Sequence, residues 1–404
     1  MTTLSEELSW RGFVNQTTFA DITDLDRETR TFYFGVDPSA SSMHIGNLAG
    51  VMMVKHLISA GHKPIVLVGG ATGMIGDPKQ DVERDLKTLD EIAHNKAGIA
   101  AQYHSLLEGQ SFELVDNYDW FKDIGYLGFL RDIGKHFSMT QLLDREFIKA
   151  RIGDGGVGIS YAEFSYSLIQ GYDFLHLFRE LGATMQVGGS DQWGNMLSGA
   201  QMIKKLEGAD AHVLTVPLVI DKKTGKKFGK SEGNAVWLDA AQTSPYKFYQ
   251  FWLNTDDEMA EDLIKIYTML DRVTIESLIA DHRINPGERA LQKTLAREVT
   301  ELVHGRERRE SVERVTAVLF GGESISSLST DDLDALATEI PTVAVGDSVI
   351  NTLTASGVAA SNGEARRLIA SGGVTVNGQK ITDDNTITDT SLIKKGKNSF
   401  VLAR

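Results

Sequence analysis

Four short apolar runs, separated by longer helix-like stretches, constrain the fold of this chain more than any other feature. The runs are rich in β-branched or aromatic residues and occupy residues 31–37, 63–70, 183–189 and 212–220. Helix-like stretches such as 45–60 and 161–181 lie between them, and three of the runs carry glycine within or just after them. Alternation of this kind predicts a parallel sheet wrapped by helices, with ligands bound at the carboxyl ends of the strands.

The rest of the chain predicts three further parts. Apolar residues at helical spacing indicate helices near 257–270, 274–282 and 287–319. Closer to the C-terminus, Asn377-Gly378 between apolar runs predicts a β-hairpin. We therefore expect an α/β domain at 1–222 with an insertion over roughly 80–160, a helical domain at 223–323, a linker at 324–344 and a compact α+β module at 345–404.

Charge is unevenly distributed along the chain. The 404 residues include 41 basic and 55 acidic side chains, and the net charge of −14 argues against a protein coated with nucleic acid. Between residues 361 and 404, however, seven basic residues outnumber four acidic ones, so this segment alone has a charge of +3. This asymmetry is modest and becomes informative only with the fold of the segment: it is consistent with contacts to phosphate groups, and a solvated basic surface is the alternative.

Two absences narrow the functional classes. Without cysteine the chain can form neither a disulfide nor a thiolate metal site. Its first residues, MTTLSEELSW, lack the basic start and apolar centre of a targeting peptide, and no apolar run approaches the length of a membrane span. We therefore expect a cytoplasmic protein that is not attached to a membrane.

The segment YFGVDPSASSMHIGN combines a strand end with a helix start. Tyr33, Gly35 and Asp37 point to one side of the strand, and Gly35 leaves room for a ligand against the backbone. His44 and Asn47 fall at the start of the next helix, where free N–H groups and the helix dipole favour anions such as phosphate. The alternative is a strand–loop–helix turn with an incidental histidine.

Two more segments offer polar groups suited to a small ligand. The glycine-rich loop LVGGATGMIGDP ends at Asp77, and such a loop approaches a substrate closely while aiming one carboxylate at it. Tyr166, Gln170 and Asp173 are spaced i, i+4 and i+7, which places them on one helix face. A phenol, an amide and a carboxylate suit an ammonium group and a hydroxyl, although such a face ordinarily contacts water.

The last two segments bear on a nucleotide. In MQVGGSDQWGN, Asp191 and Gln192 follow a glycine pair at a strand end, a common arrangement for binding a ribose diol. In TGKKFGKSEGN, Lys227 and Lys230 flank Phe228-Gly229 in a lysine-rich turn. A solvated hairpin is the alternative for this turn.

Taken together, these motifs resemble one enzyme family. His44-Ile45-Gly46-Asn47 resembles the HIGH signature of class I aminoacyl-tRNA synthetases, and the KFGKS turn resembles their KMSKS loop. With GDP and GSDQWGN between them in that order, the chain resembles the tyrosyl-tRNA synthetases of bacterial type from about residue 30 to its C-terminus. The resemblance implies a Rossmann-like doubly wound sheet with a connective insertion, a helical domain and a terminal RNA-binding module.

The resemblance also implies which residues act. His44, Asn47, Lys227 and Lys230 would stabilise charge at the phosphates during adenylate formation. Tyrosine would be bound by Tyr33, Asp77, Tyr166, Gln170, Asp173 and Gln192. ATP would be bound by Gly35, Asp37, Ser39, His44, Asn47, Gly189, Asp191, Lys227, Lys230 and Ser231. Mg²⁺ would accompany ATP, and the family implies neither a metal site of the protein's own nor a tightly bound cofactor.

The C-terminal module and the insertion imply partners. GVAASNGEARRLIASGGVTVNGQKI resembles a small RNA-binding module of a ribosomal protein, in which Arg366, Arg367 and Lys380 would contact tRNA(Tyr). Members of the family are homodimers, and the aromatic-rich segment GYLGFLRDIGKHF is a candidate for part of the interface.

Three positions differ from the family pattern. Asn47 replaces the second histidine of the signature, Phe34 stands where a small residue is frequent, and Gly50 stands where a hydroxyl residue often touches the nucleotide. We expect these differences to affect nucleotide affinity and not the type of reaction.

Three other functions share part of the pattern. They are a tryptophanyl-tRNA synthetase, a non-catalytic RNA-binding protein derived from a synthetase, and a small-molecule nucleotidyltransferase. Tyr33 with Asp173 and the terminal module argue against the first. The KFGKS turn and Asp77 argue against the second, and the third has no use for an RNA-binding module.

Overall fold

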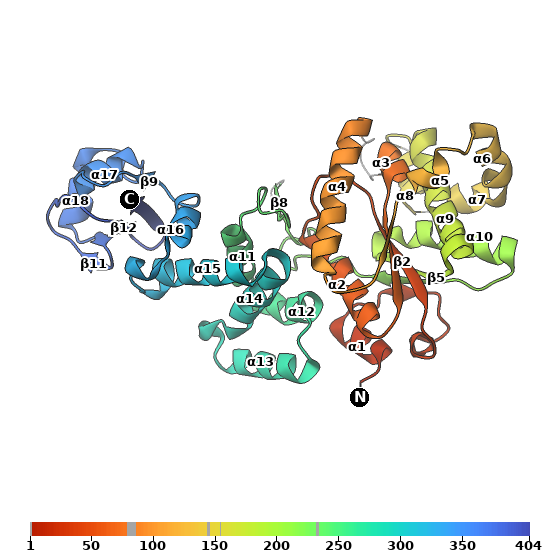
Figure 1. Ribbon diagram of the computed structural model, residues 1–404, viewed down its shortest axis with the longest axis horizontal. Coiled ribbons are helices and arrows are strands. Elements are labelled where there is room, and N and C mark those ends of the chain that lie inside the picture. The colour runs from red at the N-terminus through yellow and green to blue at the C-terminus, as the bar shows by residue number, and fades with distance from the viewer. Residues whose placement is uncertain (1, 79–85, 144–145, 154, 232–233) are drawn as a thin grey trace. The chain divides into compact units, whose positions relative to one another are not determined.

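The chain forms two compact units in the computed structural model, which describes residues 2–78, 86–143, 146–153, 155–231 and 234–404 (Figure 1). Unit 1 comprises Met1–Ser244 and Phe251–Val299, and unit 2 comprises Pro245–Gln250 and Thr300–Arg404. The predicted helical domain at 223–323 is therefore divided between the two units.

Unit 1 contains a six-stranded sheet in the order β1-β6-β5-β2-β3-β4. The strands are β1 (Gln16–Thr17), β2 (Thr31–Val36), β3 (Lys63–Val68), β4 (Glu113–Val115), β5 (Ala183–Gly189) and β6 (His212–Val216). All neighbours run parallel except β1 with β6. The chain passes outward from β2 through β3 to β4 and then returns to β5 on the other side of β2. This reversal creates a topological switch point at the carboxyl ends of β2 and β5, where open α/β sheets bind ligands.

Helices cover both faces of this sheet, as the sequence pattern predicts (Figure 1). The helices of unit 1 are α1 (Leu4–Arg11), α2 (Ile45–Ser59), α3 (Gly70–Ile75), α4 (Leu89–Leu106), α5 (Tyr118–Phe121), α6 (Tyr126–Asp132), α7 (Met139–Leu143), α8 (Glu146–Ile152), α9 (Tyr161–Leu181), α10 (Trp193–Glu207), α12 (Asp257–Tyr267) and α13 (Arg272–Ile284), while α11 (Pro245–Leu253) and α14 (Ala290–His304) contain the unit boundaries. Helix α9 begins at its Ser160 cap and ends at Gly182, whose φ of 69° is left-handed.

The alternation of side chains along β2 divides its residues between the two faces. Tyr33 joins the core cluster that also holds Phe174 of α9 and Met196 of α10. The neighbouring Phe34 points to the opposite face, where it meets Gly50 of α2. Residues on β2 therefore reach both sides of the switch point.

The predicted insertion contains one strand that the sequence did not reveal. Strand β4 pairs in parallel with β3, so part of this region belongs to the main sheet. Three residues are too few to show a period-two pattern, which is the signal on which strand prediction depends.

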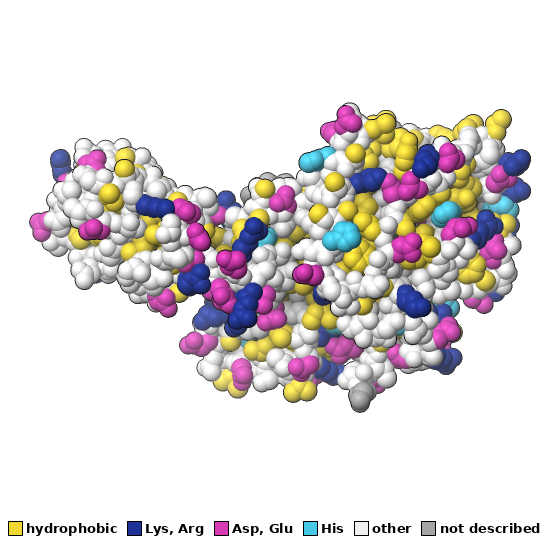
Figure 2. Space-filling view, in the orientation of Figure 1, with side chains coloured by type: hydrophobic (Ala, Val, Ile, Leu, Met, Phe, Trp, Pro, Cys, Tyr) yellow, Lys and Arg dark blue, Asp and Glu magenta, His cyan; other side chains and the backbone are white. Residues whose placement is uncertain are grey.

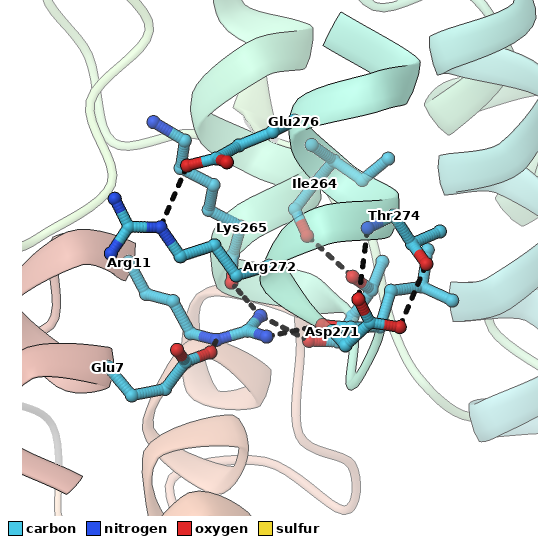
Figure 3. A network of polar contacts seen from close by, with 10 residues as sticks. Glu7, Arg11, Ile264, Lys265, Asp271, Arg272, Thr274 and Glu276 are labelled. Carbon is cyan, nitrogen blue, oxygen red and sulfur yellow. Dashed lines mark hydrogen bonds and ion pairs between the residues drawn. The ribbon is translucent and has the colours of Figure 1, made fainter. Parts of the chain in front are cut away.

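The N-terminal helix is tied to the helices that follow the sheet. The guanidinium of Arg11, which is buried, donates hydrogen bonds to the carbonyl oxygens of Lys265, Thr268 and Leu270 at the end of α12 (Figure 3). From the same helix, the hydroxyl of Tyr267 donates to the carbonyl oxygen of Ile45, at 3.0 Å. Because Ile45 is the first residue of α2, these bonds fix α12 against the end of α2 that carries His44.

Unit 2 ends in a five-stranded sheet with helices against it. Its elements are α15 (Arg306–Thr316), α16 (Thr330–Ala337), β9 (Thr342–Val343), α17 (Val349–Ala355), α18 (Asn362–Ala370), β10 (Val374–Val376), β11 (Gln379–Lys380), β12 (Ser391–Lys395) and β13 (Ser399–Ala403). The predicted hairpin is confirmed, with Asn377 and Gly378 at φ of 50° and 82° between β10 and β11.

The predicted linker at 324–344 contains folded elements. Helix α16 lies in it, and β9 pairs with β13 of the terminal sheet. Buried Asp332 accepts hydrogen bonds from Arg314 at 2.8 and 2.9 Å, which joins α16 to α15. The sequence suggested a linker because Ser and Gly precede the short helix, whereas its packing partners lie far along the chain.

Candidate active site

A cavity of about 370 Å³ opens at the carboxyl ends of β2, β5 and β6, at the switch point. Its size is within the range of small-molecule sites. Residues predicted from five separate segments line it together: Tyr33, Gly35, Asp37, Ser39, His44, Asn47, Asp77, Tyr166, Gln170, Asp173, Gly189, Asp191, Gln192 and Lys227. The backbone of Lys230 and Ser231 forms strand β7, but their side chains lie outside the described part of the structure.

The inner end of the cavity brings together Tyr33 and Asp173, each only 2% exposed. The hydroxyl of Tyr33 has no hydrogen-bond partner among the residues that the structure describes. Asp173 accepts hydrogen bonds from Asn117 Nδ2 at 3.0 Å and Trp120 Nε1 at 2.9 Å. Burial nevertheless raises the pKa of Asp173 to about 7. The inner end of the cavity therefore holds a buried hydroxyl, that of Tyr33, and a buried carboxyl, that of Asp173, and both can form further hydrogen bonds.

Asn117 and Trp120, which bond Asp173, were not among the residues predicted from the sequence. Both belong to the segment after β4, in the region interpreted as an insertion. Asn117 is completely buried, and its Oδ1 also accepts a hydrogen bond from the backbone N–H of Ala71, at 2.7 Å. The local signal for them is the polar DNYDW sequence that follows the apolar residues Leu114-Val115.

The middle of the cavity gathers carboxylates and neutral donors. Tyr166 donates from its hydroxyl to Asp37 at 2.7 Å, and burial together with this carboxylate raises the pKa of the Tyr166 phenol. Gln192 Nε2 donates to Asp77 at 2.9 Å. Gln170 Oε1 is buried without a hydrogen-bond partner within the described residues. Carboxylate and carbonyl oxygens gathered in this way suit a ligand that brings an ammonium group.

His44 and Asn47 together cap helix α2. His44 Nδ1 accepts a hydrogen bond from the Gly46 N–H at 3.0 Å, which assigns the proton of a neutral ring to Nε2. Asn47 Oδ1 accepts from the backbone N–H of His44 at 3.1 Å. An amide in this position therefore closes the helix end by its oxygen and keeps its Nδ2 donors for other contacts. The positive end of the helix dipole and the ring of His44, which carries its proton on Nε2, favour an anion at this end of α2.

The lysine-rich turn is joined directly to the start of α2. The backbone N–H of Ile45 donates to the carbonyl oxygen of Val236, and that of Leu238 donates to Met43, at 3.0 and 2.9 Å. The two segments thus form one small antiparallel pairing that holds the turn against the helix end.

Glycine and aromatic packing fix the turn further. Gly229 has a φ of 76°, and a Cβ at this position would lie 2.4 Å from Ile45 Cδ1. Next to it, the ring of Phe228 is buried and packs against Phe251 and Trp252. The position of the turn therefore depends on a glycine and not on the lysines alone.

Lys227 supplies positive charge at the outer end of the cavity. Its Nζ lies 3.0 Å from Asp191 Oδ2, so a cation and the carboxylate predicted for the ribose are paired. A second lysine that the sequence did not reveal, Lys87, also lines the cavity. The cavity thus has a buried end suited to a hydroxyl, an acidic middle and a cationic outer end.

Comparisons with known proteins agree with this arrangement. The model for "tRNA synthetases class I (W and Y)" matches residues 25–321, and the model for a "Tyrosine--tRNA ligase SYY-like C-terminal domain" matches residues 332–404. Tyrosine–tRNA ligase of Bacteroides thetaiotaomicron is 42% identical and covers 98% of each chain. That of Flavobacterium psychrophilum is 43% identical, over 100% of this chain and 97% of its own.

Solved structures show the same fold. A C-terminally truncated mitochondrial tyrosyl-tRNA synthetase of Aspergillus nidulans has a TM-score of 0.71 and 29% identity, covering 79% of this chain and 95% of its own.

Proposed function

This chain belongs to the class I tyrosyl-tRNA synthetases, and we propose that it joins L-tyrosine to tRNA(Tyr) in two steps that use ATP. In the first, a carboxylate oxygen of tyrosine attacks the α-phosphorus of ATP, pyrophosphate leaves and tyrosyl-adenylate forms. In the second, a hydroxyl of the terminal ribose of tRNA attacks the tyrosyl carbonyl and AMP leaves. The observation that carries this proposal is the buried Tyr33 and Asp173 pair at the inner end of a cavity whose outer end is cationic.

The inner half of the cavity is proposed to hold tyrosine. The substrate hydroxyl would lie between Tyr33 and Asp173, because both carry bonding capacity that the described residues leave partly unused. Its ammonium group would lie among Asp77, Tyr166 and Gln170, and its carbonyl region would contact Gln192. Without a substrate hydroxyl, the buried Tyr33 hydroxyl stays unpaired and Asp173 keeps only its bonds from Asn117 and Trp120, which is the physical basis for rejecting phenylalanine.

The outer half is proposed to hold ATP. His44, Asn47, Lys227 and Lys230 would stabilise the negative charge that builds on the phosphates as pyrophosphate leaves. Asp191 would bind the ribose. The remaining predicted contacts are Gly35, Asp37, Ser39, Gly189 and Ser231.

We propose that Mg²⁺ enters with ATP, since the triphosphate supplies most of its ligands. In the described part of the chain no group of three or more His, Cys, Asp or Glu residues could hold a metal ion by itself. A cavity with single carboxylates such as Asp191 fits a cation bound mainly by phosphates. When bound, the ion neutralises charge on the phosphate oxygens.

A pyrophosphate-exchange assay with tyrosine, tryptophan and phenylalanine tests the proposed activity. We expect exchange with tyrosine and only traces with the other two amino acids. Tryptophan-dependent exchange would point to the tryptophan-specific relatives, with which this chain shares a fold. Absence of exchange with all three would support a non-catalytic RNA-binding protein.

Unit 2 is proposed to bind tRNA through Arg366, Arg367 and Lys380. All three side chains are exposed, and within the described residues none has an ion-pair partner. Arg366 and Arg367 lie on α18, and Lys380 lies on β11 after the Asn377-Gly378 turn. Three unpaired cations on a small module suit contacts with phosphates.

Reversing these three charges tests tRNA binding separately from adenylate formation. We expect the triple variant Arg366→Glu, Arg367→Glu, Lys380→Glu to raise KM for tRNA about 100-fold and to lower the salt dependence of binding, because roughly three phosphate contacts are lost. Pyrophosphate exchange should stay unchanged. Lys63→Glu, an exposed change at the start of β3, is the control. Normal charging by the triple variant would contradict this role of unit 2.

We propose that the protein is a homodimer in the cytoplasm. None of the described helices is long and apolar enough to cross a membrane. Exposed apolar side chains gather on α3 and on α5 to α9 (Figure 2): Met74, Tyr118, Tyr126, Leu127, Met139, Leu143, Ile152, Val157 and Tyr161. Several exposed apolar side chains in one region of a unit are a feature of interfaces between subunits.

The dimer is tested at Leu127, which is 78% exposed. We expect Leu127→Glu to raise the dimer dissociation constant at least about tenfold, since a carboxylate would be buried without a partner. Val273→Glu on α13 is the matched control, because Val273 is 77% exposed and lies outside the apolar surface. Light scattering over a dilution series gives the mass. A wild-type protein with the mass of one chain would refute the proposal.

A further inference from the structure

Phe34 and Gly50, two of the positions that differ from the family pattern, are in direct contact. A Cβ built on Gly50 would lie 2.5 Å from Cζ and 2.9 Å from Cε2 of Phe34. Real Cβ atoms do not come this close to a neighbour. Phe34 is only 6% exposed and is held between the sheet and α2, so its ring cannot swing away without disturbing the core. The ring therefore occupies the space that a side chain at position 50 would need.

Both residues line the cavity, on the side away from Tyr33. Phe34 pairs in register with Val66 of β3 and Val187 of β5, and its side chain points to the α2 face of the sheet. Gly50 lies one turn after Asn47 on α2. The wall that they form belongs to the same cavity as His44 and Asn47 at the start of α2 and Asp191 after β5.

The proposed function sets the nucleoside of ATP beside this wall. With the phosphates at the start of α2 and the ribose at Asp191, both Phe34 and Gly50 line the same cavity as these groups. Neither side chain of the pair has a polar atom. Contact here can therefore come from shape and apolar surface only, not from hydrogen bonds.

We propose that Phe34 and Gly50 are a matched pair that shapes the nucleoside subsite for ATP, so that neither residue tolerates change alone. The proposal rests on the proposed function for the identity of the nucleotide. A side chain at position 50 collides with the ring, and loss of the ring leaves the nucleoside without its apolar wall. When both change together, the new side chain at position 50 fills the space that the ring leaves.

A double-mutant cycle tests this pairing. The proteins are the wild type, Phe34→Ala, Gly50→Thr and the double variant, each measured for KM of ATP and of tyrosine by pyrophosphate exchange. We expect each single change to raise KM for ATP about tenfold, and the double variant to return to within about threefold of the wild type. KM for tyrosine should stay within about twofold throughout. If Gly50→Thr does not fold, Gly50→Ala with Phe34→Ala gives the same cycle with a smaller added group.

Two controls separate the pairing from general damage. Phe32→Ala removes a fully buried ring from the same face of β2, and should lower the melting temperature without a selective rise in KM for ATP. Gly287→Ala places a Cβ where nothing lies within 4 Å, and should change neither quantity.

Several results would overturn the pairing. If the single effects on KM for ATP multiply in the double variant, the two residues act independently. If KM for tyrosine rises in place of KM for ATP, the wall serves the other substrate. The same four proteins can also be compared by melting temperature and by calorimetric binding of ATP, two measurements that do not depend on catalysis. A wild type that binds ATP but does not exchange with tyrosine would therefore refute the proposed function, while the coupling in these two measurements still decides the pairing.

Discussion

Asp173→Ala abolishes the preference for tyrosine over phenylalanine, with kcat/KM for tyrosine expected to fall about 100-fold, since an unpaired buried polar group costs up to about 3 kcal/mol. The substrate hydroxyl would lose its acceptor in a place from which water is excluded. The value of kcat/KM for phenylalanine should stay the same or rise, because phenylalanine never used the carboxyl. KM for ATP should not change, because Asp173 lies at the inner end of the cavity.

Asp173→Asn is the matched control for this experiment. It keeps the shape and one acceptor oxygen, and it should lose less selectivity than the alanine variant. An alanine variant that still rejects phenylalanine as strongly as the wild type would show that the hydroxyl is recognised elsewhere.

The pH dependence gives a second readout for Asp173. Burial raises its pKa to about 7, so the carboxyl of the free protein is protonated below that pH and ionised above it. An ionised carboxylate accepts the substrate hydroxyl more strongly. The ratio of kcat/KM for tyrosine to that for phenylalanine should therefore rise between about pH 6 and pH 8. The profile should be flat in Asp173→Asn, and a wild-type profile equally flat would exclude this role for the ionisation.

The free energy of unfolding should change with pH in the direction opposite to the tyrosine selectivity. A raised carboxyl pKa means that the folded protein holds this proton more tightly than the unfolded chain does. The contribution of Asp173 to the free energy of unfolding is therefore complete below its unfolded pKa of about 4, and is lost as the pH rises through about 7. The folded protein should therefore be less stable above pH 7, in the same range in which it recognises tyrosine better.

Lys227→Ala is expected to lower kcat for adenylate formation about 100-fold to 1000-fold, the usual effect of removing one preorganised charge from a transition state. Lys227 pairs with Asp191 at 3.0 Å, at the outer end of the cavity. A triphosphate would compete for this ammonium group as charge builds on the leaving pyrophosphate. KM for tyrosine should change little, since tyrosine is proposed to bind at the other end.

The neighbouring lysine offers a matched control. Lys226 is exposed in the same turn but does not line the cavity, so Lys226→Ala should keep its full rate. Lys227→Arg keeps the charge and should recover part of the lost activity. Single-turnover measurements of adenylate formation separate this step from product release. Equal losses in the Lys226 and Lys227 variants would show a structural role for the turn in place of a role in charge stabilisation.

Elements with strong local signals could be predicted from the sequence. Helix α9 was expected at 161–181 and has these bounds, because a serine cap, an apolar periodicity and Gly182 all agree. The main strands β2, β3, β5 and β6 were expected for the same kind of reason. Strand β4 was missed, because three residues of strand carry too little pattern to stand out.

The candidate site divides in the same way. Its motif residues could be selected because strand ends and helix starts in an α/β chain bring functional groups to one edge of a sheet. Asn117 and Trp120 could not be selected, since their role depends on hydrogen bonds to Asp173, which is more than 50 positions away in the chain.

The sequence by itself determined the class of fold, the order along the chain of the strands that end in functional residues, and the types of side chain available for catalysis. These depend on local periodicity and on residues close together in the chain. Only the tertiary structure decided that Phe34 and Gly50 touch, that Asn117 and Trp120 hold Asp173, and that the lysine-rich turn is paired with the start of α2. The physical reason is that crossovers of the sheet set the distances between remote segments, and close packing then leaves each contact a single geometry.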